Sequence, residues 1–293
     1  MRVVPALLWH TAVLNRNDRH SRPRVVMKFD VFLQCVRDEV NDVDSATARA
    51  FARDIALVVL GGRPSFMLDY GAGKLTRYLM RFAKRAGEIF SVDVADVVVI
   101  ELEQTYFLSN LKMLEALRTE QVLFVDVDTD KPSILREGDS KRSSVDEAIH
   151  DILVKISRAP REQNTISLGS IVGLHESIAP PTVAGVLLGY PAAYVCERRS
   201  MSRAGSTLSA CPLTLHVVQE KGKEDNGNDA VVVSGWTIPT TLYSSMDDDT
   251  GVWFGENVRA WECRVLHAAG TLGIASLEYK RMHKPGGHER VVF

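Results

Sequence analysis

The stretch with the clearest potential for chemistry is DYGAGK, residues 69–74. An apolar segment, residues 65–69, leads into it and a helical run, residues 74–86, follows, so the pattern predicts a strand, a glycine turn and a helix. Glycines let a backbone approach a ligand closely, and the free N–H groups that open a helix favour negative charge. Four residues are therefore candidates for contact with a phosphate or a nucleotide-like cofactor: Asp69, Gly71, Gly73 and Lys74. The alternative is that the glycines only form a tight corner with close helix–strand packing.

Two common phosphate-binding motifs do not fit this stretch. The pair Gly73-Lys74 is present, but a Walker A loop also needs an earlier glycine and a following hydroxyl residue, and Leu68 and Leu75 occupy these positions. The dinucleotide motif G-x-G-x-x-G needs a third glycine where Thr76 stands. Neither a P-loop nor a dinucleotide fingerprint is therefore predicted.

The D-x-G-x-G pattern of Asp69, Gly71 and Gly73 resembles the cofactor loop of class I S-adenosylmethionine-dependent methyltransferases. The resemblance implies that the glycines line S-adenosylmethionine and that an acid at the end of the next strand holds the ribose hydroxyls. That acid would be Asp93 if IFSVD is the second strand, or Glu101 if VVVIELE is. The chain lacks the third glycine and the catalytic Asn/Asp-Pro-Pro-aromatic tetrapeptide of that family. The resemblance therefore names no catalytic residue, and the candidate cofactor-binding set is Asp69, Gly71, Gly73, Lys74, Asp93 and Glu101.

Four basic residues share one face of the helix predicted after the loop. They are spaced three or four residues apart, at Lys74, Arg77, Arg81 and Lys84. Such a row is typical of a solvated outer face, and the alternative is a contact with a small anionic ligand or nucleic acid. The net charge of −2 gives no overall attraction to nucleic acid. The partner is therefore left open between a small anionic ligand and a protein.

Composition and cysteine spacing predict a soluble intracellular protein. The 293 residues are 45% apolar and 25% charged, which is ordinary for a globular chain, and no apolar run reaches the roughly 18 residues needed to cross a bilayer. The four cysteines form no C-x-x-C pair, which argues against a disulfide scaffold and a structural metal site. His216 stands alone and is interpreted as a satisfied buried or surface histidine. We expect a cytoplasmic location, with mitochondrial import as the alternative because four arginines lie between residues 16 and 24.

The first half of the chain is predicted to be a parallel βαβαβ unit. Strands are expected over residues 65–69, 96–102 and 121–128, and helices over 27–42, 46–60 (capped by Ser45), 74–86, 106–119 and 144–157 (capped by Ser144). Beyond residue 160, three β-rich runs joined by polar turns predict an antiparallel meander over residues 183–197, 206–220 and 229–242. A helix over 256–269 and a strand over 274–280 follow. The simplest assembly is one mixed sheet in a single α/β domain, residues 27–293, after a weakly ordered basic extension, residues 1–26; two domains divided near residue 160 are the alternative.

Three phrases resemble a eukaryotic family that is itself uncharacterised, uncharacterised protein family 0739. They are RPSFMLDYG, LLGYPAAYVC and WTIPTTLYS, which cover residues 63–71, 187–196 and 236–244. The resemblance implies a single-domain protein of no established activity, so it supplies no catalytic residue. We expect an uncharacterised binding or interaction protein, and the alternative is an S-adenosylmethionine-binding, methyltransferase-like enzyme that uses the loop from Asp69 to Gly73.

Overall fold

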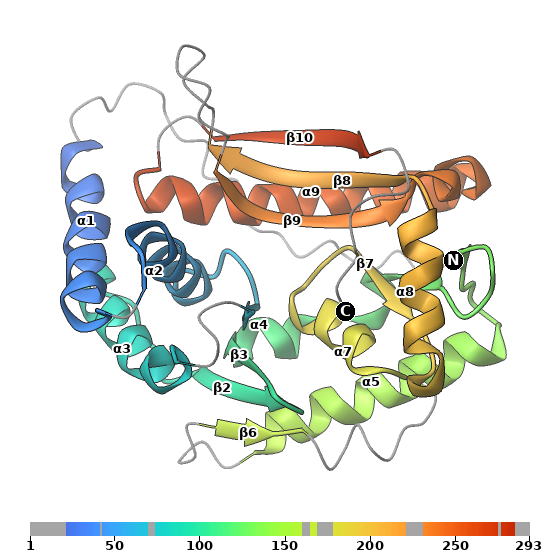
Figure 1. Cartoon of the computed structure of the whole chain (residues 1–293), viewed down its shortest axis with the longest axis horizontal. Helices are drawn as coiled ribbons and strands as arrows, with labels where there is room; N and C mark the ends of the chain where they lie inside the picture. Colours follow the sequence, from blue (N-terminus) through green and yellow to red (C-terminus); the bar gives the residue numbers. More distant parts are fainter. Residues whose placement is uncertain are drawn as a thin grey trace.

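A computed structural model gives the conformation of most of the chain. It describes residues 22–41, 43–69, 74–159, 165–168, 178–220, 231–274 and 277–284. The strands form three sheets, and helices pack against each of them (Figure 1). Most of the predicted N-terminal extension lies outside the described residues.

Three helices pack together in the N-terminal part of the protein. They are α1 (Arg22–Glu39), α2 (Ser45–Val59) and α3 (Leu79–Phe90), the last preceded by the short helix η1 (Thr76–Tyr78). Phe32 joins α1 to α3 through edge contacts with the rings of Phe82 and Phe90, at centroid distances of 6.4 and 6.1 Å. The cap of α2 is Asp44 rather than the predicted Ser45, because the Asp44 carboxylate accepts hydrogen bonds from two N–H groups of the first turn.

The first sheet has the order β1-β3-β2-β6. Its strands are β1 (Ser65–Leu68), β2 (Val97–Leu102), β3 (Thr105–Asn110) and β6 (Thr165–Ser167). Strands β1 and β2 are each antiparallel to β3, whereas β6 is parallel to β2. The predicted helix over residues 106–119 is wrong in its first half, because residues 105–110 form a strand and only α4 (Leu111–Ala116) is helical. Asn110 marks the change, since its side chain accepts a hydrogen bond from Met113 N.

The second sheet has the order β5-β4-β7. It consists of β4 (Leu123–Asp126), β5 (Ser133–Ile134) and β7 (Ala192–Val195), with the short helix η2 (Thr119–Gln121) before β4. Strands β4 and β7 are parallel, so their carboxyl ends lie at one edge of the sheet. The helices α5 (Ser140–Arg158) and α7 (Pro180–Leu187) accompany it. Helix α5 begins before the predicted cap Ser144, after Asp139, whose side chain instead accepts a hydrogen bond from Arg136 N.

The third sheet is antiparallel and has the order β10-β8-β9, which confirms the predicted antiparallel pairing in the C-terminal half. Its strands are β8 (Leu213–Glu220), β9 (Val232–Pro239) and β10 (Leu277–Lys284). The long helix α9 (Asp248–Thr271) follows η4 (Thr240–Ser245) and runs along this sheet (Figure 1). The indole of Trp236 on β9 packs edge-on against Trp261 and Phe254 of α9, which holds the helix to the sheet.

Two of the predicted β-rich runs begin with helices. Residues 180–187 form α7, and residues 201–210 form α8 (Met201–Ala210) after η3 (Arg198–Ser200). Pro180 and Pro181 occupy the first positions of α7, where a missing N–H costs nothing, and this start signal outweighs the β-branched residues that follow. The first run therefore contributes only β7 to a sheet, and that strand pairs with β4 rather than with β8.

The predicted fold class, helices combined with sheets that contain parallel and antiparallel strands, is confirmed. Within the described residues the strands divide into three sheets instead of one. β1 and β2 run in the same direction, as a parallel unit requires, but β3 separates them and β4 belongs to another sheet. None of the helices in the described residues combines the length and apolarity needed to span a membrane.

Candidate functional site

The structure describes only part of the glycine loop, residues 69–74, that the sequence singles out as a candidate site. Asp69 follows β1, whereas Gly71 and Gly73 lie outside the described residues. Loss of solvent around its carboxyl group raises the pKa of Asp69; the nearby Asp54 carboxylate adds to this rise, and Arg63 opposes it. Asp69 is thus a carboxylate in a partly desolvated, charged neighbourhood.

Of the two candidate ribose acids, only one lies at the edge of the sheet where β1 ends. Leu68 and Glu101 both pair with Tyr106, so Glu101 lies in the same row as the last residue of β1, with β3 between them. Two strand spacings place these backbones about 10 Å apart. Asp93 precedes β2 and accepts a hydrogen bond from Ala95 N at 3.0 Å, at the opposite end of that strand. The geometry therefore groups Asp69 with Glu101 and not with Asp93.

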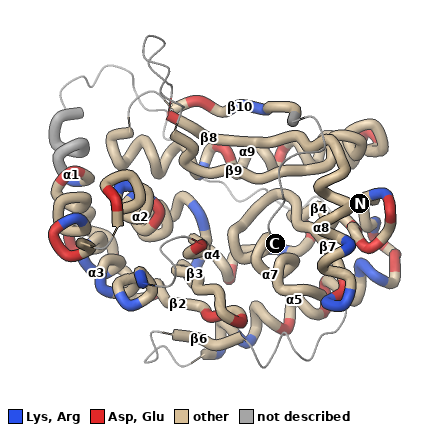
Figure 2. Tube along the Cα trace, viewed as in Figure 1, with Lys and Arg blue, Asp and Glu red and all other residues tan. Residues whose placement is uncertain are grey.

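The predicted basic face is solvent-exposed, but its residues do not share one helix, because Lys74 precedes η1, Arg77 lies on η1, and Arg81 and Lys84 lie on α3. Lys74 and Lys84 are exposed, and Arg81 pairs with Glu39 of α1 at 2.9 Å. The Arg77 guanidinium lies over the ring of Tyr78, 4.8 Å from its centroid. Exposed pairs of this kind contribute little to stability or recognition. Basic and acidic segments are interspersed along the described chain in Figure 2.

The three phrases quoted for the family resemblance come together in space. Gly189, at φ +68°, lies directly against the ring of Pro64, so a side chain there would collide with it. The Tyr194 hydroxyl donates a hydrogen bond to Thr237 O at 2.9 Å. These contacts tie the start of β1 to the loop before β7 and tie β7 to β9. The phrases therefore share packing contacts among the three sheets.

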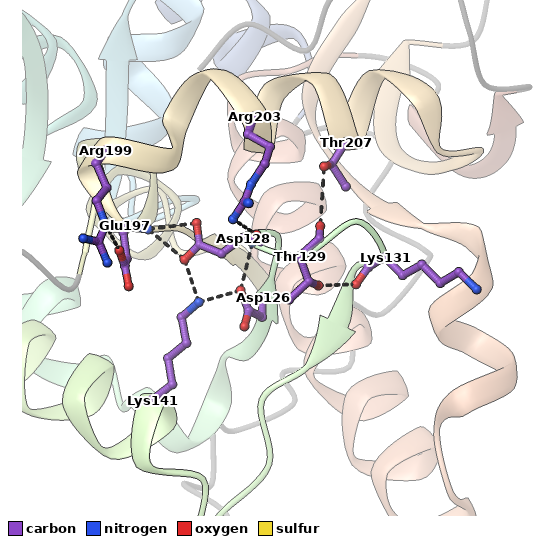
Figure 3. A network of polar contacts seen from close by, with 9 residues as sticks. All are labelled: Asp126, Asp128, Thr129, Lys131, Lys141, Glu197, Arg199, Arg203 and Thr207. Atoms are coloured by element: carbon purple, nitrogen blue, oxygen red, sulfur yellow. Dashed lines mark hydrogen bonds and ion pairs between the residues drawn. The ribbon is translucent and has the colours of Figure 1, made fainter.

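A polar network gathers at the carboxyl ends of β4 and β7 (Figure 3). The Lys141 ammonium, from the first turn of α5, lies 2.6 Å from Asp126 Oδ1 and 2.7 Å from Asp128 Oδ2. Asp128 also accepts a hydrogen bond from Glu197 N after β7, and its carbonyl oxygen accepts one from Arg203 of α8. Burial would lower the pKa of Lys141, but the two carboxylates outweigh it and raise the pKa above its ordinary value.

This β4–β7 network joins β4, β7, α5 and α8. Its polar groups bond one another, so they are not free to bond a ligand. The carboxyl ends of parallel strands are a common place for ligands, and a cavity of about 490 Å³ adjoins the network. However, Asp126 and Asp128 share the ammonium of Lys141 as their partner, and Arg199 pairs with Glu197 at 2.5 Å. We therefore interpret the network as a brace that holds α5 and α8 against the second sheet.

A larger cavity, of about 690 Å³, opens between the first half of α9 and strand β10. We call it the α9–β10 groove and define it by His216, Tyr243, Gly251, Gly255, Tyr279 and Arg281. Residues Trp236, His216 and Arg281 form one row across the third sheet, because His216 pairs with Trp236 on one side and with Arg281 on the other. The row lies on the face of the sheet that α9 covers. The central strand of the sheet, β8, therefore forms the floor of the groove.

His216 is fixed by contacts on both ring nitrogens and on one ring face. Its Nδ1 lies 2.6 Å from the Tyr279 hydroxyl and its Nε2 2.5 Å from the Tyr243 hydroxyl. The imidazole stacks on Trp236, with 4.1 Å between ring centroids and an interplanar angle of 5°. His216 is only 2% exposed, so of the two predicted alternatives, a satisfied buried or surface histidine, the structure shows the buried one. The groove above it was not predicted.

The charge state of this trio leaves one hydrogen-bond donor unused. Burial, and secondarily the positive charge of Arg281, lowers the pKa of His216 to about 4, so the imidazole is neutral near neutral pH. A neutral imidazole donates through one nitrogen and accepts through the other. One tyrosine therefore gives its hydroxyl hydrogen to His216, while the other accepts from His216 and keeps its own hydrogen. Whichever tautomer forms, one tyrosine hydroxyl can donate to a further acceptor.

The rest of the groove combines open space with charged side chains of both signs, which are Arg259 and Arg281 and the carboxylates of Asp247, Asp248 and Glu262. The Arg281 guanidinium lies over the ring of Tyr243, 3.9 Å from the centroid, and no carboxylate of the described residues pairs with it. A Cβ atom added to Gly251 or Gly255 of α9 would meet nothing within 4 Å, and neither glycine has a positive φ. Neither helix packing nor backbone conformation therefore requires these glycines.

A protein-family model matches residues 34–266 of the chain, and its description is a domain of unknown function, DUF4504. A comparison with curated proteins found no match, and a comparison with solved structures found none either. Because the family model covers most of the chain, the protein belongs to the DUF4504 family. The match spans all three sheets and includes His216 and Tyr243, whereas β10 lies beyond it.

Proposed function

We propose that this DUF4504 protein is a binding protein whose ligand occupies the α9–β10 groove. The observation that carries the proposal is the fixing of His216 between the hydroxyls of Tyr243 and Tyr279 at the floor of a 690 Å³ cavity. Small-molecule sites are typically concave, largely apolar and equipped with a few fixed polar groups. The groove shares part of this character, because Val258 and Phe254 line it beside the tyrosine hydroxyls, and it also carries two arginines and three carboxylates.

The polar groups favour a ligand that presents a hydrogen-bond acceptor, such as a carboxylate. One tyrosine hydroxyl hydrogen is unused within the His216 trio, and the Arg281 guanidinium offers several N–H donors together with a positive charge. The apolar part of the ligand would lie over Gly251 and Gly255, where no side chain fills the space. This assignment refines the expectation of a binding or interaction protein.

The test is a ligand-observed NMR screen of small organic carboxylates and their neutral amides against the full chain. The variant Gly255→Leu fills the groove, and Gly270→Leu is its matched control, because Gly270 is also on α9 and also has open space but does not line the groove. Carboxylates should bind the wild type and Gly270→Leu and lose binding to Gly255→Leu. Equal binding to all three proteins, or no binding to the wild type, contradicts the proposal.

S-adenosylmethionine binding by the loop from Asp69 to Gly73 is the second candidate function. The observation in its favour is that Asp69 and Glu101 lie at one edge of the first sheet. The strand order weighs against it, because β3 lies between β1 and β2, the strand that carries Glu101. Calorimetric titration with S-adenosylmethionine separates the cases: micromolar binding that Asp69→Ala abolishes supports this candidate, and no heat with the folded protein excludes it. The resemblance to uncharacterised protein family 0739 remains a prediction.

A further inference from the structure

We infer that the ligand of the α9–β10 groove is an extended peptide segment that adds to the outer edge of β10 and places an Asp or Glu opposite Arg281. This inference rests on the proposed binding function and names the partner. Strand β10 pairs with β8 over eight residues and is the outermost strand of its sheet. Within the described part of the chain, no strand pairs with its other edge. An edge strand presents unpaired N–H and C=O groups to which a further extended chain can bond.

The groove lies where the side chains of an added strand would reach. Side chains of successive strand residues alternate between the two faces of a sheet. Every second side chain of a peptide beside β10 would therefore descend on the face of Tyr279 and Arg281, toward α9. The open space above Gly251 and Gly255 can receive these side chains. Main-chain bonds to a sheet edge combined with pockets for alternate side chains are a recurring mode of peptide recognition.

Charge selects an acidic residue at one position of the peptide. Lys280 and Arg281 are exposed on β10, and cations on an edge strand oppose pairing with neutral or basic strands. Lys280 is paired with Glu278 at 2.6 Å, so Arg281 carries the charge without a carboxylate partner among the described residues. Acidic residues also line the groove, at Asp247, Asp248 and Glu262. The preference for Asp or Glu is therefore confined to the peptide position that faces Arg281.

The test is a selection from a phage-displayed peptide library on the immobilised full chain, followed by fluorescence polarisation with the selected synthetic peptides. The expected peptides have alternating residues with an Asp or Glu at one face. Arg281→Glu should weaken their binding by about tenfold or more, because a charge-assisted pair becomes a repulsion. Lys280→Glu is the matched control, since it changes the same charge on the same strand but on the opposite face. It should change affinity by less than about threefold at moderate salt, since exposed charges are screened.

Strand addition also requires hydrogen bonds between the peptide backbone and β10. N-methylation of the peptide backbone at alternate residues removes donors to β10, so one of the two methylation patterns should abolish binding. Three results would overturn the inference: no enriched peptide, equal loss in Arg281→Glu and Lys280→Glu, or insensitivity to both methylation patterns. If small carboxylates still bind the wild type and fail to bind Gly255→Leu, the groove remains a binding site and only the peptide is rejected. Failure of the carboxylate screen instead rejects the groove itself.

Discussion

The buried His216 predicts a measurable dependence of stability on pH. Its ordinary pKa is near 6.5, and in the folded protein burial and the charge of Arg281 lower that pKa to about 4. Between these values the unfolded chain binds a proton that the folded protein does not. The free energy of unfolding should therefore be fully retained above about pH 6.5 and should fall as the pH is lowered through this window.

The two pKa values give the size of the effect. Applied to a single site, they predict that His216 costs about 2 kcal/mol of stability between about pH 7 and about pH 5. The charged groups and rings that face it support neutrality: Arg281 and Tyr279 on β10, Tyr243 on η4 and Trp236 on β9. None of these side chains carries a negative charge at neutral pH that would stabilise an imidazolium.

The assay is urea unfolding at the two pH values for the wild type and for His216→Gln. Glutamine keeps a donor and an acceptor but does not titrate, so the variant isolates the contribution of this one histidine from that of the seven others. The loss of stability on acidification should be smaller in the variant by about 2 kcal/mol. An equal pH dependence in the two proteins would refute the buried, neutral state of His216 from which the unused hydroxyl hydrogen was deduced.

Three further predictions concern stability. Gly255→Ala and Gly270→Ala should each raise the free energy of unfolding by roughly 0.5–1 kcal/mol, because alanine favours a helix and the added methyl group meets open space. Urea titration checks this, and a loss of stability in Gly255→Ala contradicts the open groove. Lys141→Met should lower the free energy of unfolding by roughly 2 kcal/mol near neutral pH, since two largely buried carboxylates lose their shared cation; urea titration checks this, and an unchanged stability contradicts the brace. Gly189→Ala should destabilise by roughly 2 kcal/mol or more through strain and collision with Pro64, and a thermal melt unchanged from the wild type contradicts that contact.

Much of the N-terminal fold follows from local patterns. The apolar spacing of residues 45–59 predicts α2, and the β-branched run over residues 97–102 predicts β2. Strand β3 was missed because its hairpin turn is Glu103–Gln104, with Glu103 at φ 56°. Such turns are usually marked by Asn-Gly or Asp-Gly, and glutamate gives no such signal. Because the residues of α4 favour a helix, the predicted helix was extended at its start over residues that form β3.

The α9–β10 groove could not be predicted from sequence patterns for a different reason. Its floor joins His216, Tyr243 and Tyr279 from β8, η4 and β10, and the register between β8 and β10 decides that they meet. A shift of that register by one residue would turn Tyr279 to the other face of the sheet. The isolated histidine carried no spacing signal, so the sequence left open whether it was buried or at the surface.

The most direct test of the account is ¹⁹F NMR of the full chain labelled with 3-fluorotyrosine. The chain has seven tyrosines, and the variants Tyr243→Phe and Tyr279→Phe assign the two resonances of the groove floor. Addition of the best carboxylate from the screen should shift these two resonances in the wild type and in Gly270→Leu, and should leave them unmoved in Gly255→Leu. Shifts confined to the other five tyrosines, or equal shifts in Gly255→Leu, would contradict ligand binding in the α9–β10 groove.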